Sequence, residues 1–161
     1  MTVEDAEPRP APGRTRGTLA ELYAAQYLPM VRLGYLLTGS TAVAEDLVQD
    51  SFVQLQRNWA GVREPTAYLR RSVVNACNTH HRRVGRERER FPGLVRDTVV
   101  AEDTDTLDAL AALPHRQRAA LVLRYYEDRT DAEIAEVLGC RPATVRSLVH
   151  RGLATLRKVI T

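Results

Sequence analysis

Apolar residues recur at helical spacing along most of the chain, in segments that glycine, proline and polar residues separate. Over residues 18–37 they fall three or four positions apart, and Gly39 ends the pattern. A second helical segment covers residues 42–59, and a third begins at Thr66. Because a period near 3.6 residues places one apolar stripe on each helix, these segments predict helices that pack on a common core.

Helical spacing resumes in the C-terminal third of the chain. The pattern begins again at Leu107, and Pro114 is placed to open a helix, where its missing N–H costs nothing. Five side chains after this proline are expected to enter the core: Ala119, Leu121, Val122, Tyr125 and Tyr126. The whole chain is therefore predicted to be all-α, with two small helical domains.

Two short helical patterns meet at a glycine near the C-terminus. Thr130 and Glu133 have the spacing of a capping box, so a helix is expected to begin at Asp131. Gly139 suits the left-handed conformation that ends a helix, and Pro142 suits the first turn of the next one. A small residue, a turn glycine and a β-branched residue at fixed offsets are typical of a helix-turn-helix. Here they are Ala135, Gly139 and Val145.

The second of these two helices has an apolar face and a basic face. Its apolar positions are Val145, Leu148, Val149, Leu153, Leu156 and Ile160. The side chains expected to point away from the core are Thr144, Arg146, Ser147, His150 and Arg151. Residues 139–161 carry five basic residues and no acidic one, and such one-sided charge attracts a phosphate backbone. The alternative is a plain pair of helices with solvated arginines.

The second helical segment carries a polar cluster opposite its apolar stripe. The cluster consists of Glu45, Asp46, Gln49 and Asp50. Carboxylates near a helix N-terminus interact favourably with the helix dipole, so a merely solvated face is one interpretation. The other interpretation is a docking surface for a basic partner.

The third helical segment combines basic, amide and aromatic groups. A polar loop over residues 58–66 precedes it. We expect five of its side chains to face inward: Tyr68, Leu69, Val73, Ala76 and Cys77. We expect seven to face outward: Arg70, Arg71, Asn75, Asn78, His81, Arg82 and Arg83. Such groups suit single-stranded or distorted nucleic acid, because arginines neutralise phosphates and rings stack on bases.

Composition adds limits on partners and location. Residues 1–17 are rich in proline and predict a disordered tail, and the mixed charges from residue 84 predict a linker. No apolar run reaches the roughly 18 to 20 residues that span a bilayer, and the N-terminus lacks the apolar core of a secretory signal. We therefore expect a cytoplasmic protein without membrane insertion.

The sequence predicts no metal site, no cofactor and no catalytic centre. Cys77 and Cys140 provide no disulfide framework. A zinc site at Cys77, His80 and His81 is disfavoured, because adjacent residues on a helix point about 100° apart. No nucleophile, carboxylate pair or glycine-rich phosphate loop has a suitable context, so we do not expect an enzyme.

Three stretches together resemble the bacterial RNA polymerase sigma factors of the extracytoplasmic-function group. TAVAEDLVQDSFVQLQRNW is similar to the segment that binds core polymerase, and LDALAALPHRQRAALVLRYYEDRTDAEIAEVLGC is similar to the helices before the recognition helix. ATVRSLVHRGLATLR is similar to the recognition helix itself, and its Arg-Gly-Leu points to a sigma-E-like subgroup in actinobacteria. The resemblance implies four parts: a tail at 1–17, sigma region 2 at 18–83, a linker at 84–103 and sigma region 4 at 104–161.

The resemblance also implies partners and contact residues. Core RNA polymerase would bind through its β′ coiled coil and β flap, and the β′ contacts would be Glu45, Asp46, Gln49 and Asp50. The −10 promoter element would be opened and bound by Asn58, Trp59, Arg63, Tyr68, Arg70, Arg71, Asn75, Arg82 and Arg83. The −35 element would be read by Arg141, Thr144, Arg146, Ser147, His150 and Arg151. An anti-sigma factor would be a further partner.

Several positions depart from the family's pattern. Tyr68 replaces a tryptophan and Thr79 an aspartate in the melting helix. Arg141 replaces a serine N-cap, Leu148 an arginine and His150 a small residue, so an altered −35 preference is expected. Two alternatives to a sigma factor stay open: a one-component helix-turn-helix regulator that binds duplex DNA as a dimer, and an adaptor held by protein partners.

Overall fold

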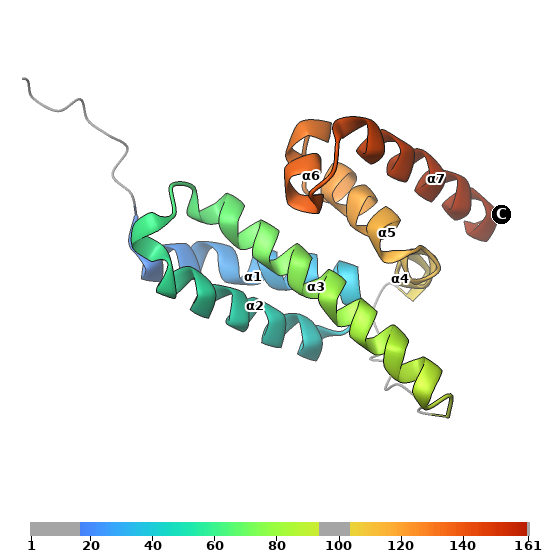
Figure 1. Ribbon diagram of the computed structural model, residues 1–161, viewed down its shortest axis with the longest axis horizontal. Coiled ribbons are helices and arrows are strands. Elements are labelled where there is room, and N and C mark those ends of the chain that lie inside the picture. Colours follow the sequence, from blue (N-terminus) through green and yellow to red (C-terminus); the bar gives the residue numbers. More distant parts are fainter. Residues whose placement is uncertain (1–16, 94–103, 161) are drawn as a thin grey trace, which may run out of the picture.

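The computed structural model describes residues 17–93 and 104–160, and every regular element in these two ranges is helical (Figure 1). The predicted all-α class with two helical groups is confirmed. Residues 1–16 of the predicted tail at 1–17, and residues 94–103 of the predicted linker at 84–103, lie outside the described residues.

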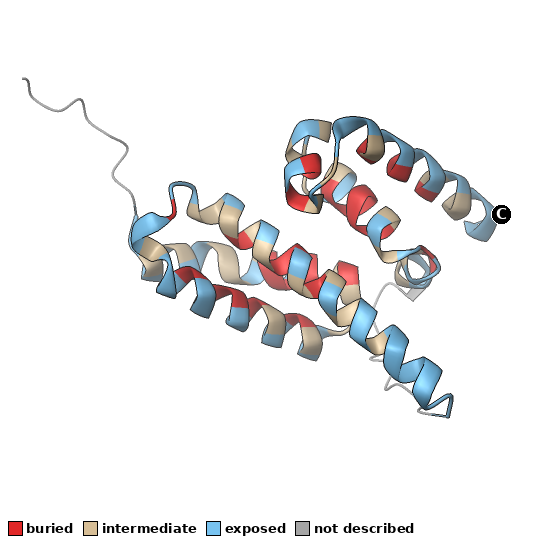
Figure 2. Ribbon diagram, viewed as in Figure 1, coloured by how far each residue is buried: buried red, intermediate tan, exposed pale blue. Residues whose placement is uncertain are grey.

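The first domain is a bundle of three helices. They are α1 (Leu19–Thr38), α2 (Thr41–Arg57) and α3 (Pro65–Arg90). Thr18 and Ser40 cap the first two helices, since each side-chain oxygen accepts a backbone N–H three residues on. Gly39 ends α1 with φ 75°, a left-handed conformation that costs glycine little. Buried positions lie on the sides of the helices that face one another (Figure 2).

The third helix is longer than the sequence pattern indicates. A short 3₁₀ turn, η1 (Trp59–Gly61), follows α2, and α3 then begins at Pro65. Helix α3 continues through Arg90, so the predicted start of the linker at Val84 is wrong: residues 84–90 are helical. Beyond Val84 the helix is exposed and projects from the bundle (Figure 2). The alternating charges of this segment allow a solvated helix as readily as a linker.

The second domain consists of short helices followed by one long helix. They are α4 (Thr104–Ala111), α5 (His115–Leu121), the π-helical turn η2 (Val122–Tyr126), α6 (Asp131–Leu138) and α7 (Pro142–Ile160). Helix α7 packs on α4, α5 and α6. As predicted, Pro114 precedes α5 and Gly139 separates α6 from α7.

The π-helical turn overturns part of the predicted core. Ala119, Leu121 and Val122 are buried, but Tyr125 and Tyr126 are 61% and 48% exposed. The N–H of Glu127 bonds to the carbonyl of Val122, five residues back. This wider turn rotates the following side chains away from the face that regular helical spacing predicts. Ile160, placed in the core stripe of α7, is also exposed, because it lies in the last turn of the chain's final helix.

The two domains meet at the C-terminal end of α1. The last four carbonyls of a helix have no partner within it. Here the N–H of Gly39 donates to Tyr35 O at 2.7 Å, which satisfies the first of these four carbonyls. The next two carbonyls need partners from elsewhere in the fold.

Those partners are a histidine of α3 and an arginine of the second domain. The ring Nε2 of His81 bonds to Leu37 O, so this nitrogen carries the proton. Nε of Arg118 donates to Leu36 O at 2.6 Å, although the two residues lie 82 positions apart. Arg118 is only 4% exposed, and burial lowers its pKa to about 10, so it stays charged at neutral pH. The sequence pattern assigned no role to Arg118.

Candidate nucleic-acid and polymerase interfaces

The helix-turn-helix forms as the sequence predicts. The N–H of Glu133 donates to Thr130 Oγ1 at 3.2 Å, which starts α6 at Asp131. The hydroxyl of Thr130 also donates to the Glu133 carboxylate, and this bond, aided by Arg129, lowers the pKa of Glu133. Gly139 then turns the chain with φ 65°. The two helices of the motif are therefore held at a defined turn.

Helix α7 and Arg141, the residue before it, carry the six predicted contact residues. Five of the six are exposed, namely Arg141, Arg146, Ser147, His150 and Arg151. The sixth, Thr144, is half-buried. The Ser147 hydroxyl donates to Ala143 O, and Arg151 Nε donates to Ser147 O at 3.3 Å. Arg146 lies 3.9 Å from an Asp131 oxygen, a loose ion pair that leaves the guanidinium accessible.

The glycine in the Arg-Gly-Leu stretch has a structural reason. Gly152 is buried where α7 crosses α5, and a Cβ there would come within 2.9 Å of Leu121 Cδ1. The glycine therefore sets how closely α7 approaches α5. In the sequence this stretch served only as a mark of family resemblance.

The polar cluster of α2 is exposed in full. Glu45, Asp46, Gln49 and Asp50 all face solvent, and Gln49 Nε2 donates to the Tyr23 hydroxyl at 2.8 Å. Within residues 17–93 and 104–160, none of the three carboxylates forms an ion pair. The negative charge of this surface is therefore available to a basic partner.

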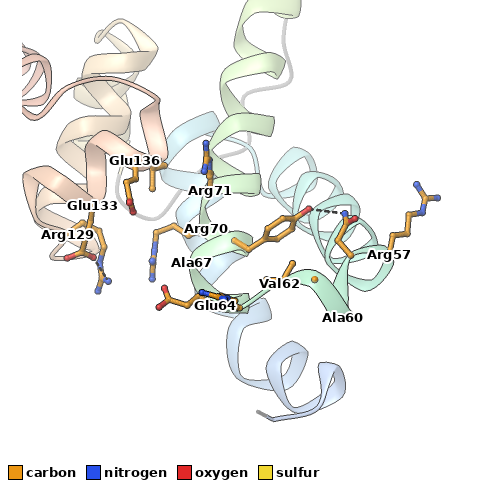
Figure 3. A pocket seen from close by; sticks show the side chains of 15 residues that line it. Arg57, Ala60, Val62, Glu64, Ala67, Arg70, Arg71, Arg129, Glu133 and Glu136 are labelled. Atoms are coloured by element: carbon orange, nitrogen blue, oxygen red, sulfur yellow. Dashed lines mark hydrogen bonds and ion pairs between the residues drawn. The ribbon is translucent and has the colours of Figure 1, made fainter. Parts of the chain in front are cut away.

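The start of α3 faces a cleft of about 1100 Å³ between the two domains (Figure 3). One wall comes from the end of α2, η1 and the start of α3, and the other from Arg129 and α6. Asn58 Nδ2 donates to the Tyr68 hydroxyl at 3.2 Å inside this cleft. Five of the residues predicted to contact the −10 element line it: Asn58, Arg63, Tyr68, Arg70 and Arg71.

The other predicted −10 residues lie outside this cleft. Asn75 and Arg83 line a hollow of about 410 Å³ between α2 and α3, together with Asp50. Trp59 is half-buried in η1, and the exposed Arg82 donates to Thr79 Oγ1 at 3.4 Å. The structure thus places five residues of the predicted set in the cleft and two in the hollow, and it leaves Trp59 and Arg82 outside both.

Arg70 is not free, contrary to its predicted outward position. Its Nε lies 3.2 Å from the carboxylate of Glu127 in the second domain, and the two side chains are 12% and 13% exposed. The second domain adds Glu133 and Glu136 to the same cleft. Sequence spacing gives no signal for such a pairing, because the partners are 57 positions apart.

Two histidines, His81 and His115, lie together at the domain boundary. His81 stacks on His115 with ring centroids 6.0 Å apart, and burial lowers the pKa of both rings. Burial raises the pKa of the Cys77 thiol to about 12. In the described part of the chain, no three His, Cys, Asp or Glu side chains converge as metal ligands. Nor does any described helix combine the length and apolar character that crossing a bilayer requires.

Both domains match known family models. Residues 22–87 match Sigma-70 region 2, and residues 104–156 match Sigma-70 region 4. The first match includes the acidic face of α2 and most of α3, and the second includes the helix-turn-helix. The matched stretches lie in the same order as the two helical domains.

Proteins with similar sequences are sigma factors as well. The RNA polymerase sigma-E factor of Streptomyces avermitilis is 34% identical over 71% of this chain and 69% of its own length. The ECF RNA polymerase sigma factor SigE of Mycolicibacterium smegmatis is 36% identical over 78% of this chain and 55% of its own.

A solved structure has the same fold. The sigma factor RpoE of Bartonella quintana, in complex with the anti-sigma factor NepR, aligns with a TM-score of 0.73 at 21% identity, over 88% of this chain and 95% of that chain. The chain belongs to the extracytoplasmic-function group of bacterial RNA polymerase sigma factors, which direct promoter-specific transcription.

Proposed function

We propose that the two domains divide promoter recognition between them. The observation that carries this proposal is the exposed basic face of α7, joined in one chain to the exposed acidic face of α2. A helix of this kind enters the major groove of duplex DNA, where arginines reach base edges and phosphates. The −35 contacts would be Arg141, Thr144, Arg146, Ser147, His150 and Arg151.

The first domain would open and hold the −10 element. Tyr68 and Asn58 offer a ring and an amide for an unstacked base, and the cleft beside them is lined by arginines that can neutralise phosphates. The remaining contacts would be Trp59, Arg63, Arg70, Arg71, Asn75, Arg82 and Arg83. Arg70 can take part only after it leaves Glu127, because both partners are nearly buried.

Core polymerase would dock on the acidic face of α2. Unpaired carboxylates attract a basic surface and steer its approach, so Glu45, Asp46 and Asp50 suit the β′ coiled coil as partner. The β flap would hold the second domain. The chain would act in the cytoplasm and without catalytic chemistry of its own, since polymerase supplies the reaction.

An anti-sigma factor is the remaining proposed partner. The similar fold from Bartonella quintana was solved with such a factor bound, which supports this proposal for the present chain. The division of the chain into region 2 at residues 18–83, a linker at 84–103 and region 4 at 104–161 belongs to the same proposal. Because α3 continues through Arg90, the linker is moved to begin after that residue.

The test is run-off transcription with purified core polymerase on genomic promoter fragments. A sigma factor gives promoter-dependent transcripts and binds promoter DNA poorly without core. A dimeric one-component regulator would bind palindromic half-sites with no need for polymerase. An adaptor would yield neither result. Absence of promoter-dependent transcripts with an active core would contradict the proposed function.

A further inference from the structure

One carboxylate of the helix-turn-helix lies between two arginines. Asp131 is the first residue of α6, and its Oδ1 accepts a hydrogen bond from Nη1 of Arg124 in η2. Its other oxygen, Oδ2, lies 3.9 Å from Nη1 of Arg146 on α7. The acid therefore links three elements of the second domain, and Arg146 is one of the six proposed −35 contacts.

The two arginines are held by this acid to different degrees. The Arg124 side chain is 40% exposed and that of Asp131 24%, whereas the Arg146 side chain is 64% exposed. Arg124 takes one carboxylate oxygen by a direct hydrogen bond, so it anchors Asp131 and stops the acid from turning fully onto Arg146. The contact to Arg146 is longer and uses one of five guanidinium donors, so the other donors stay available to a ligand.

A tether of this kind suits a side chain that reads a base. A free arginine samples many rotamers, and a base contact must fix them at a cost in entropy. Asp131 restricts Arg146 before DNA arrives, which lowers that cost as in other preorganised contacts. An exposed ion pair contributes little in water, but DNA that displaces water from the surface strengthens the attraction. The tether therefore has its largest effect in the bound complex.

The same acid opposes contacts that carry no sequence information. A carboxylate beside a basic face repels phosphates, so it weakens binding to DNA of every sequence. Asp131 thus acts on two kinds of contact in opposite directions, because it favours a base contact by Arg146 and disfavours phosphate binding. A residue that only stabilised the fold would not separate the two.

We propose that Asp131, anchored by Arg124, positions Arg146 to read a base pair in the major groove and thereby determines the sequence specificity of this chain. Asp131 and Arg124 are positioning residues, since both act through the guanidinium of Arg146. The inference rests on the proposed function, because it takes α7 as the reader of duplex DNA. It adds one residue of η2 and one of α6 to the proposed recognition surface.

Selection from random duplex DNA tests this inference without knowledge of the promoter sequence. The probe is a pool of labelled duplex oligonucleotides with about a dozen randomised base pairs. The full chain, in which the basic face of α7 is exposed, binds the pool at low salt, where phosphate contacts are strongest, and the bound fraction is sequenced. Arg146→Ala identifies the position whose base preference depends on Arg146.

The expected result has two parts. At the position identified by Arg146→Ala, we expect Asp131→Asn to reduce the base preference about fivefold, because the guanidinium is no longer held. Its affinity for the unselected pool, measured by fluorescence anisotropy, should rise by up to about twofold, because one negative charge is lost. The preference and the general affinity therefore change in opposite directions.

Three further variants separate the tether from a general effect of charge. Asp108→Asn makes the same change of side chain at an exposed position of α4, so it should leave the base preference unaltered. Asp131→Glu keeps the carboxylate and should retain most of the preference. Arg124→Gln should lower the preference at the same position, and adding it to Asp131→Asn should cause no further loss. Circular dichroism checks that each variant is folded.

The inference is overturned if no base preference depends on Arg146, or if Asp131→Asn keeps the preference at that position. An equal loss in Asp108→Asn would overturn it as well. Polymerase takes no part in the selection, so run-off transcription with core polymerase is an independent result. A base preference that depends on Asp131, without any promoter-dependent transcript, would leave the inference standing and contradict the proposed function.

Discussion

The Nε atom of Arg118 donates a hydrogen bond to the carbonyl oxygen of Leu36 at 2.6 Å, and this bond places a cation at the negative end of α1. Helix α1 has no basic residue of its own in its last turn. A positive charge near a helix C-terminus is stabilised by the helix dipole, and the effect is larger where the site is shielded from water. The second domain thus completes the end of a helix in the first.

Replacing Arg118 with alanine should separate the domains. The change removes a charged hydrogen bond, and we expect the closed arrangement to lose about 1–2 kcal/mol, net of the relief of the unpaired Nη2. The radius of gyration from small-angle scattering is the measurement. Arg116→Ala, an exposed arginine of the same helix, is the control. An unchanged radius in Arg118→Ala would show that other contacts hold the domains.

Acid should open the same contact. Burial is the main cause that lowers the pKa of His81 and His115 below the usual 6.5, so the closed arrangement favours neutral rings. The charged and titratable groups around them act in the same sense: His80 and Arg118 near His81, and Arg82 and Arg116 near His115. The stabilisation of the closed arrangement by the neutral rings is fully present above pH 6.5, and it is lost as pH falls through the lowered pKa values of His81 and His115.

Scattering at pH 7.5 and pH 5.5 measures this dependence. We expect a larger radius of gyration at the lower pH. His81→Gln should weaken the dependence, because its amide can donate to Leu37 O without titrating, and the remainder should come from His115. A radius that does not change with pH in the unmodified chain would show that neither ring is linked to closure.

Reversing Asp50 should weaken binding to core polymerase. Asp50→Lys places a positive charge on the acidic face of α2, where we expect an affinity loss of about tenfold or more. Asp108→Lys makes the same charge change at an exposed position of α4 and serves as control. Binding of labelled protein to immobilised core is the measurement. Equal losses in both variants would argue against a specific role for α2.

Alanine at Arg146 or Arg151 should weaken binding of duplex promoter DNA. A base contact would relax specificity at one position by about 1–3 kcal/mol, whereas a phosphate contact would weaken all sequences and reduce the salt slope by about one. Lys158→Ala, near the end of the same helix, is the control. Affinity measured over a salt series distinguishes the cases. Two variants with unaltered affinity and slope would refute the assignment of this face.

A side chain at Gly139 should destabilise the fold, although there is room for one. A Cβ at Gly139 or at Gly61 would meet no atom within 4 Å, yet only Gly139 has a positive φ, 65°. We expect Gly139→Ala to cost about 1–2 kcal/mol of unfolding free energy, and Gly61→Ala to change it by less than about 0.5 kcal/mol. Urea denaturation followed by circular dichroism provides both values. Equal costs would mean that the turn relaxes.

Local features of the fold were predictable because their causes lie within a few residues. The cap at Thr130 and the stops at Gly39 and Gly139 need only a neighbouring N–H or a left-handed φ. The exposed side of α7 follows from its spacing alone. Each of these appears in the structure where the sequence places it.

Long-range features were not predictable from one sequence. The burial of Arg118 and the pairing of Arg70 depend on how two domains meet, and periodicity carries no information on that. The exposure of Tyr125 depends on one widened turn, and aromatic residues at helical spacing indicate core by default.

The end of α3 limits how far apart the two proposed DNA-binding surfaces can move. Thirteen residues lie between Arg90 and Thr104, and a fully extended chain of that length reaches at most about 45–50 Å. A linker that began at Val84 would have reached roughly 70 Å by the same measure. The seven extra helical residues therefore shorten the stretch of promoter DNA that the two proposed surfaces of one molecule can span.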